Sequence, residues 1–198
     1  MTGAVPVRFL YVGQIRREKG IEDIIAASRI LLGQPLPFHI SLAGSVAGWA
    51  HDKFAPELVA RVGADPNLSA VISFLGNVEN VDEAYQAHQV HLAPSLVEES
   101  YGLVIVEAKQ NARPSIVYPS GGMIELIENG KDGLICEAPV VEQLASAMLY
   151  FLGNPSAISH MGHQARASLE RLGLVRDQFN ARWAGIASSA ARIGRRRA

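Results

Sequence analysis

Runs of apolar residues alternate with amphipathic stretches along most of the chain. Six of these runs have the length and bounds of buried β-strands, at 9–12, 38–43, 71–75, 90–93, 115–118 and 134–136. Each of the first five is followed directly by a glycine or a proline. These residues end a strand and let the chain turn into a loop.

The stretches between the strands predict helices. Apolar residues of the first stretch recur at helical spacing and predict one buried face: Ile21, Ile24, Ile25, Leu31 and Leu32. Further helices are expected at 55–62, 81–88, 103–112, 141–152, 156–172 and 176–193, with a short one between Gly121-Gly122 and Asn129-Gly130, and a turn at Asp65-Pro66-Asn67. This alternation predicts one α/β domain over 1–198, a Rossmann-like doubly wound parallel sheet ending in a helical segment at 156–198.

The segment from Pro94 to Pro114 contains a strand end, a loop and a helix. Gly102 allows the backbone to approach a ligand closely, and no helix breaker follows until Pro114. Glu99 is therefore expected in the loop and Glu107 inside the helix. A carboxylate accepts hydrogen bonds from hydroxyl groups, so both residues are candidates for binding a polyol.

Backbone amides near Tyr101, Gly102 and Leu103 are expected to be unpaired, because they lie at the start of that helix. A helix N-terminus with free amides favours anions. An anion site beside two carboxylates suits a ligand that carries both phosphate and sugar hydroxyl groups.

The loop after the first strand, from Gly13 to Gly20, offers cations just before a helix begins. These are Arg16, Arg17 and Lys19. The loop fits neither the dinucleotide fingerprint nor the P-loop pattern. From composition alone, a solvated basic loop is the simpler interpretation.

Composition excludes several classes of protein. The 198 residues are 48% hydrophobic with a formal net charge of −1, which argues against disorder and gives no electrostatic case for nucleic acid. The lone Cys136 excludes an internal disulfide framework and is expected to pack in the core. The chain has no D-x-D pair, and its histidines lack the spacing typical of metal ligands. The sequence therefore predicts no metal site. Without a transmembrane run or signal peptide, a cytoplasmic protein is expected. The tail Arg195-Arg196-Arg197 is expected to be solvated, with peripheral membrane or nucleic-acid contact as the lesser alternative.

The chain resembles a known family in four ordered blocks. Glu99 and Glu107, with seven residues between them, are similar to the E-x7-E signature of retaining GT-B glycosyltransferases, most closely family four (glycosyl transferases group 1). Pro94-Ser95 precedes the first Glu as in the family, whereas Ala112 replaces the glycine that usually follows the second. The other blocks are 12–20 and 121–125. The resemblance covers roughly residues 8–137 and only the family's C-terminal, nucleotide-sugar-binding half.

The resemblance implies that Lys19, in Glu-Lys-Gly, binds the diphosphate of the donor beside the backbone of Gly13. Many family members also have an arginine directly after this glycine, where the chain has Gln14. Arg16 or Arg17 is therefore expected to supply the second cation.

The resemblance also implies roles for the two glutamates. Glu107 would accept hydrogen bonds from the nucleotide ribose, and Glu99 would contact the donor sugar near its anomeric carbon. Glu98 is an alternative candidate for the first glutamate of the signature, but the spacing between Glu99 and Gly102 favours Glu99. A solvated helical residue is the simpler interpretation of Glu107.

Two loops are expected near the rest of the donor. Gly121 and Gly122 would lie by the sugar and phosphate, with an ordinary turn as the alternative. The backbone around Val78 would line the nucleobase, and no side chain there indicates which base.

The implied activity is that of a hexosyltransferase, in which a sugar passes from a UDP- or GDP-linked donor to an acceptor hydroxyl without a metal or another cofactor. The family's N-terminal acceptor domain is expected to be absent from these residues. The chain is then an excised domain, a subunit that pairs with a separate acceptor-binding partner, or a module that only binds nucleotide sugars. A dinucleotide-binding oxidoreductase domain is a poorer alternative, because the first strand lacks G-x-G-x-x-G.

Overall fold

The computed structural model describes residues 5–46 and 52–174. Its sheet has six parallel strands in the order β3-β2-β1-β4-β5-β6. The strands are β1 (Val7–Val12), β2 (Phe38–Ala43), β3 (Ile72–Gly76), β4 (Val90–Ala93), β5 (Ser115–Val117) and β6 (Gly133–Ile135). All six predicted strands are present within a residue or two, and the predicted doubly wound parallel fold is confirmed.

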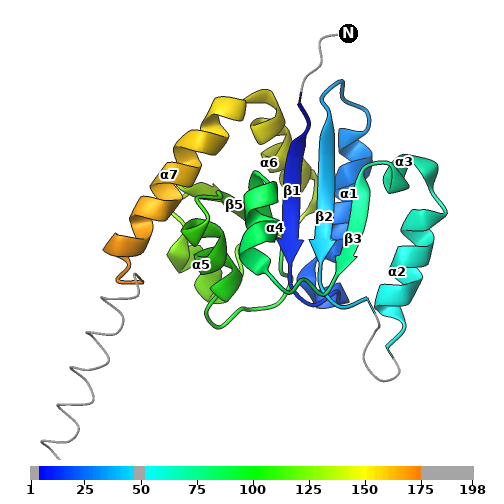
Figure 1. Ribbon diagram of the computed structural model, residues 1–198, viewed down its shortest axis with the longest axis horizontal. Coiled ribbons are helices and arrows are strands. Elements are labelled where there is room, and N and C mark those ends of the chain that lie inside the picture. The colour runs from blue at the N-terminus through cyan, green and yellow to red at the C-terminus, as the bar shows by residue number, and fades with distance from the viewer. Residues whose placement is uncertain (1–4, 47–51, 175–198) are drawn as a thin grey trace, which may run out of the picture.

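Helices cover both faces of the sheet (Figure 1). They are η1 (Arg17–Lys19), α1 (Ile21–Leu31), α2 (Phe54–Gly63), α3 (Pro66–Ser69), α4 (Val81–Ala87), α5 (Leu103–Gln110), η2 (Gly121–Leu126), α6 (Val141–Gly153) and α7 (Pro155–Arg171). In the figure, α4 lies in front of the sheet and α1 behind it. Helix α6 packs against α1, and α7 packs against α5.

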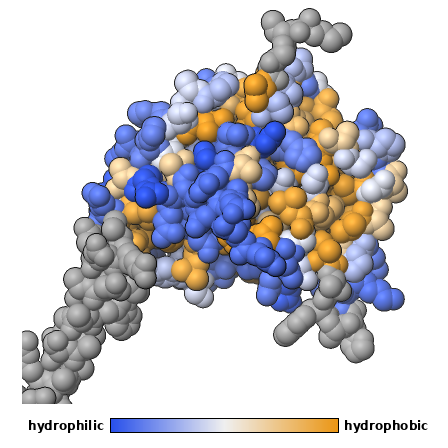
Figure 2. Space-filling model, in the orientation of Figure 1, coloured by the Kyte–Doolittle hydropathy of each residue, from blue (hydrophilic) through white to orange (hydrophobic). Residues whose placement is uncertain are grey.

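The larger core forms between the sheet and α1. Phe9 and Tyr11 of β1 point to this side and pack with Ile40 and Leu42 of β2. On the other face, Leu10 packs with residues of α4 and α5. A strand buried on both faces must be apolar at successive positions, which is why these strands appear as continuous runs in the sequence. Hydrophobic surface also remains visible toward the β2–β3 side in Figure 2.

Three local expectations are wrong. Leu32 is 37% exposed because α1 ends at Leu31, so Leu32 is no longer on the buried face. The turn at 65–67 is instead the short helix α3, since the Asp65 carboxylate accepts hydrogen bonds from the amides of Asn67 and Leu68 and caps it. The helix after Gly121 is a 3-10 helix that ends at Leu126.

Other expectations fall on residues outside the described ranges. The helix at 176–193 and the basic tail at 195–197 are among them. Cys136 is buried in the core, as expected, and burial raises the pKa of its thiol to about 11. Within the described residues, no helix is both long and apolar enough to cross a bilayer.

Candidate functional site

A cavity of about 440 Å³ opens at the carboxyl ends of β1 and β4. The chain runs from β1 outward to β2 and β3 and then returns to β4 on the other side of β1, so the strand order reverses at this point. In doubly wound sheets the crevice at such a reversal binds the ligand. The structure brings six of the predicted site residues into its wall: Gly13, Lys19, Glu99, Tyr101, Gly102 and Leu103.

Lys19 and Glu99 form an ion pair in this wall. Each side chain is 26% exposed, so both can be reached from solvent. The Ser95 hydroxyl also lies 3.0 Å from Glu99 Oε1 and 2.9 Å from the Val97 carbonyl oxygen. The loop after β1 thus supplies a cation, and the loop after β4 supplies a carboxylate that is already oriented.

The two loops also meet through their backbones. Leu96 donates its amide to the Glu18 carbonyl at 2.8 Å. Gly20 has φ +70°, and a Cβ at this position would lie 1.9 Å from the Pro94 carbonyl oxygen. Only glycine combines this backbone conformation with so close an approach. Gly20 therefore places Lys19 beside the end of β4.

The N-terminus of α5 forms another part of the wall. Gly102 caps the helix with φ +71°, and the first amides of the helix, at Leu103 and Val104, have no intrahelical partner. Residues Tyr101 to Val104 line the cavity. The start of α5 and Lys19 therefore belong to the wall of the same cavity, an arrangement typical of an anion site.

Gly121 and Gly122 lie outside the cavity wall and against the backbone of the Glu99 loop. Gly122 donates its amide to the Glu99 carbonyl at 2.8 Å, and a Cβ on Gly121 would lie 2.5 Å from the same oxygen. The two glycines therefore support the segment that carries Glu99.

Glu107 is half-buried on α5, a turn beyond the residues that line the cavity. Burial raises the pKa of its carboxyl group above the usual value, the Tyr85 hydroxyl opposes this change, and Asp82 adds to it. Tyr85 is fully buried and donates its hydroxyl to the Val104 carbonyl at 3.0 Å. Val78 also lies outside the cavity wall and packs against the cluster of Leu10 and Tyr85.

The two arginines of the first loop have acidic partners outside the cavity wall. Arg16 pairs with Glu18 at 2.9 Å, and Arg17 pairs with Glu22 at 3.4 Å. The Arg17 guanidinium also lies 4.7 Å from the centre of the Phe54 ring.

Sequence reasoning missed Tyr11, which lines the cavity and is 3% exposed. Its hydroxyl donates to the Gln14 carbonyl at 2.8 Å and so holds the loop after β1. Burial raises the pKa of Tyr11 well above its ordinary value, with Glu99 and Glu18 adding to the rise, so the phenol stays protonated. Tyr11 lies one residue before the carboxyl end of β1, and this position in the sequence could have indicated that it lines the site.

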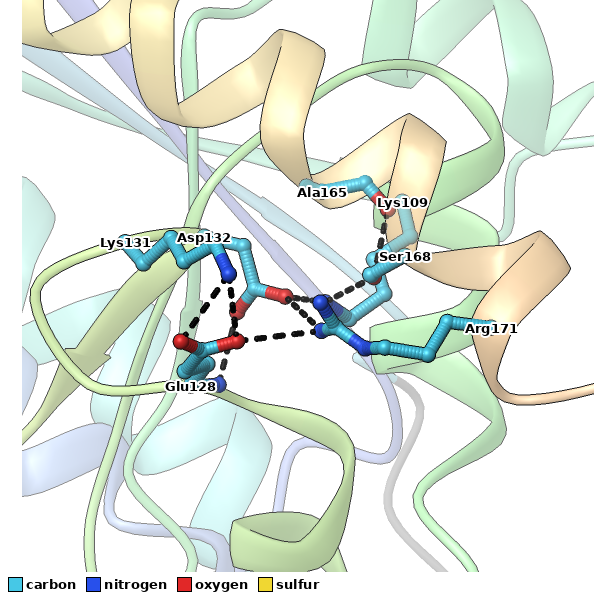
Figure 3. Close-up of polar contacts among 7 residues, drawn as sticks. All are labelled: Lys109, Glu128, Lys131, Asp132, Ala165, Ser168 and Arg171. Atoms are coloured by element: carbon cyan, nitrogen blue, oxygen red, sulfur yellow. Dashed lines mark hydrogen bonds and ion pairs between the residues drawn. The ribbon is translucent and has the colours of Figure 1, made fainter.

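Helix α5 is anchored on its far side by a buried ion pair (Figure 3). Lys109 and Asp132 are each 1% exposed, and the ammonium lies 2.7 Å from Asp132 Oδ2 and 2.8 Å from the Ser168 hydroxyl oxygen. Asp132 also accepts the Glu128 amide at 2.8 Å, and Arg171 of α7 lies 3.7 Å from its carboxylate. The pair therefore joins α5, the loop before β6 and α7.

The end of α5 explains the alanine at 112. The amide of Ala112 bonds to the Lys109 carbonyl at 3.0 Å, and that of Arg113 bonds to the Ala108 carbonyl at 2.9 Å, which together form a Schellman motif. Ala112 is left-handed, with φ +54°, at the position where such motifs usually have glycine. Gly162 of α7 allows the close approach, since a Cβ there would lie 2.2 Å from the Ala112 carbonyl oxygen.

No group of three or more His, Cys, Asp or Glu side chains among the described residues is placed to hold a metal ion. The sheet order defines a Rossmann-like domain, and the cavity at its switch point offers a cation, a carboxylate and helix N-terminal amides, groups that suit an anionic ligand. Residues 6–168 match the model of the family "Glycosyl transferases group 1", and the chain belongs to this family.

Curated relatives include a glycogen synthase of Mycobacterium tuberculosis (strain CDC 1551 / Oshkosh), which is 29% identical over 192 residues, covering 95% of this chain and 42% of the relative. A lipopolysaccharide core biosynthesis mannosyltransferase, LpcC, of Rhizobium leguminosarum bv. viciae is 31% identical over 149 residues, covering 75% of this chain and 42% of the relative. The chain thus spans less than half the length of these relatives.

Solved structures share the fold. Anabaena Alr3699/HepE in complex with UDP superposes with a TM-score of 0.82 at 22% identity, over 93% of this chain and 49% of that one. The C-terminal domain of a glycosyl transferase group 1 family protein (LpcC) from Francisella tularensis gives a TM-score of 0.72 at 21% identity, over 84% of this chain and 87% of that one.

Proposed function

We propose that the chain is the donor-binding domain of a retaining GT-B glycosyltransferase of family four, which transfers a sugar from a nucleoside diphosphate to an acceptor hydroxyl. The observation that carries this proposal is the Lys19–Glu99 pair in the switch-point cavity, next to the free amides of α5. The ammonium and the amides suit a diphosphate, and the carboxylate suits sugar hydroxyls. Membership of the glycosyl transferases group 1 supports it.

Lys19 is the first cation for the diphosphate in this proposal. Arg16 or Arg17 is the second, and either arginine would have to exchange its present carboxylate partner for phosphate. Hydrogen bonds to charged groups contribute about 1.5–3 kcal/mol each, so the cations contribute to affinity. They contribute to rate as well, because negative charge accumulates on the diphosphate as it leaves.

Glu99 contacts hydroxyls of the donor sugar, and Glu107 accepts hydrogen bonds from the ribose. The backbones near Val78 and Gly121-Gly122 border the base and the sugar. Glu107 lies along α5 from the phosphate-binding amides, which fits a nucleotide extending along that helix from the cavity.

The proposed reaction breaks the bond between the anomeric carbon and the diphosphate oxygen and forms a bond from the same carbon to the acceptor oxygen on the same face. The acceptor's proton passes to the departing phosphate oxygen. This scheme calls for no base from the protein and no metal, and the protein's part is to hold the donor and stabilise the leaving group.

Contacts to the acceptor come from another domain or a separate subunit in this proposal. The relatives are more than twice as long as the matched segment, which supports a second half. Exposed apolar side chains on the segments around the cavity also favour a covered rim: Leu96, Val97, Tyr101, Leu103 and Ile124. A module that binds nucleotide sugars without catalysis is the second candidate, because every contact assigned here is to the donor.

Calorimetric titration of the chain with UDP, GDP and ADP, in the presence of a chelator, tests the donor site. UDP is the first choice, because solved structures of the HepE fold neighbour contain it. Selective binding that weakens in Lys19→Ala and Glu107→Ala supports the proposal, and binding of none of the three opposes it. Sugar transfer by the chain, alone and with candidate partner chains, separates the enzyme from the binding module.

A further inference from the structure

A second hollow, of about 560 Å³, lies at the opposite end of the sheet from the donor cavity. Residues at the starts of β1 and β2 line it, together with residues just before β3 and β4. In Figure 1, α4 lies in front of the β1 side of the sheet, and no described helix lies in front of β2 and β3. The polar members of the lining are Arg8, His39, Ser41 and His88.

The geometry of these side chains leaves some donors free. Arg8 and His39 are register partners on β1 and β2, so they lie on the same face of the sheet. His39 Nε2 lies 3.0 Å from the Ser73 hydroxyl oxygen, and its Nδ1 has no partner among the described residues. His88 is fully engaged, with Nδ1 2.6 Å from the Ala84 carbonyl and Nε2 2.8 Å from the Ser41 hydroxyl.

The charge of the hollow is uncompensated. No carboxylate lines it. Among the lysines and arginines of the described ranges, only Arg8 and Lys53 lack a side-chain ion pair or hydrogen bond. The charged groups that act on the two imidazoles are all basic: Arg8 on His39, and Arg8, His39 and Arg113 on His88.

We propose that this hollow binds a small phosphomonoester, with its phosphate on Arg8 and His39 and its organic part against the apolar wall. A free guanidinium suits phosphate because it donates two parallel hydrogen bonds to it. When His39 Nε2 accepts from the Ser73 hydroxyl, the unpartnered Nδ1 carries the ring proton and adds a third donor. Pro6, Phe38 and Ala70 form the apolar wall. The site is separate from the donor cavity and does not rest on the function proposed above.

The imidazoles provide a local signal of binding. Burial, and then the charge of Arg8, lower the pKa of His39. A phosphate bound between Arg8 and His39 offsets that charge, so the pKa of His39 must rise on binding. His160 and His163 of α7 lie outside the hollow and act as internal references.

NMR titration of the full chain with inorganic phosphate and with glycerol 3-phosphate, followed at the histidine ring signals, tests the proposal. We expect both to shift His39 and His88 but not His160 and His163, with the ester binding more tightly. Arg8→Gln should weaken binding about tenfold or more, since a charge-assisted contact is lost, whereas Lys53→Gln, at an equally unpartnered cation, should not. The proposal is overturned if all histidines shift equally or if the two variants have equal effects. It is also overturned if phosphate binds and the ester does not.

Two controls complete the design. Circular dichroism checks the fold of Arg8→Gln. If this variant is unfolded, His39→Gln replaces it in the titration. The proposal then fails unless His39→Gln abolishes the tighter binding of the ester. Sedimentation with vesicles containing phosphatidic acid distinguishes the source of the phosphate. If the chain binds these vesicles through Arg8 but does not bind the soluble ester, the proposed small ligand is wrong and the hollow instead binds a lipid surface.

Discussion

Lys19 and Glu99 are eighty residues apart in the chain and form an ion pair in the wall of the switch-point cavity. Parallel strands β1 and β4 are neighbours, so the loops that leave their carboxyl ends must meet. In the proposed reaction the carboxylate of this pair competes with the donor diphosphate for the ammonium.

Variants of this pair should therefore have opposite effects on nucleotide affinity. Lys19→Ala removes a charged donor and should weaken UDP binding about tenfold to a hundredfold. Glu99→Gln removes the competing charge and should tighten UDP binding several-fold while it slows sugar transfer. Calorimetry on both variants measures this, with Arg29→Ala as the control, because Arg29 pairs with Asp65 in another ion pair. Weaker UDP binding by Glu99→Gln would contradict the competition.

Nucleoside binding should depend on pH through Glu107. Burial raises the pKa of this carboxyl above 4.5, so on acidification it takes up a proton earlier than an exposed glutamate. In the proposed function the ionised form accepts hydrogen bonds from the ribose, so affinity should be constant near neutral pH and should fall as the pH approaches this raised pKa from above. The nucleoside of whichever nucleotide binds is the right probe, because it has no titrating phosphate. Glu107→Gln should bind more weakly and show no such fall, and an equal fall in parent and variant would assign the effect to another group.

Ala112→Gly should stabilise the domain. The left-handed backbone at Ala112 costs about 1–2 kcal/mol for a residue with a Cβ, and glycine's greater freedom in the unfolded chain removes about 0.5–1 kcal/mol of the gain. A net increase of about 0.5–1 kcal/mol in the free energy of unfolding is expected in urea titrations. Ala87→Gly, at the last residue of α4, is the control and should destabilise by up to about 1 kcal/mol. A loss of stability in Ala112→Gly would show that the strain is absent.

Lys109→Met should be among the most damaging single changes away from the cavity. It removes the ammonium from the buried Asp132 carboxylate and leaves only the exposed Arg171 guanidinium, 3.7 Å away, so the loss should lie toward the lower end of about 3–5 kcal/mol. The double variant Lys109→Met/Asp132→Leu should recover most of this loss, since an apolar pair of similar size is often as stable as a buried ion pair. Chemical denaturation of the parent, both single variants and the double variant measures the coupling. Purely additive losses would show that the two residues do not act as a pair.

The sequence predicts the sheet well for a physical reason. Strands buried on both faces are apolar runs, and glycine or proline follows most of them, so their positions are local properties of the chain. The convergence of Lys19 and Glu99 follows from the same pattern, because both lie in loops after strands. Glu107 lies outside the cavity wall because of how α5 is rotated about its own axis. The short apolar sequence of this helix does not define that rotation.

Polar contacts between residues far apart in the chain could not be predicted from the sequence. Lys109 in a helix looks like an exposed residue, and its partners Asp132 and Ser168 are distant in the chain. The left-handed Ala112 is similar: its departure from the family's glycine is visible in the sequence, but Gly162, which makes room for its carbonyl, lies fifty residues further on. The pairing of Arg16 and Arg17 with nearby acids likewise depends on side-chain conformations.

The contact between Lys109 and Ser168, fifty-nine residues apart, has a consequence for how the protein is made. On the ribosome, helix α5 emerges well before α7, and until α7 has emerged Lys109 lacks one of its two buried partners. Domains fold as units during synthesis, so a nascent chain stopped before residue 168 should keep α5 loosely docked and open to proteases. Completion of α7 then adds the Ser168 hydroxyl to the contacts of Lys109 and gives the cavity-lining end of α5 its final position.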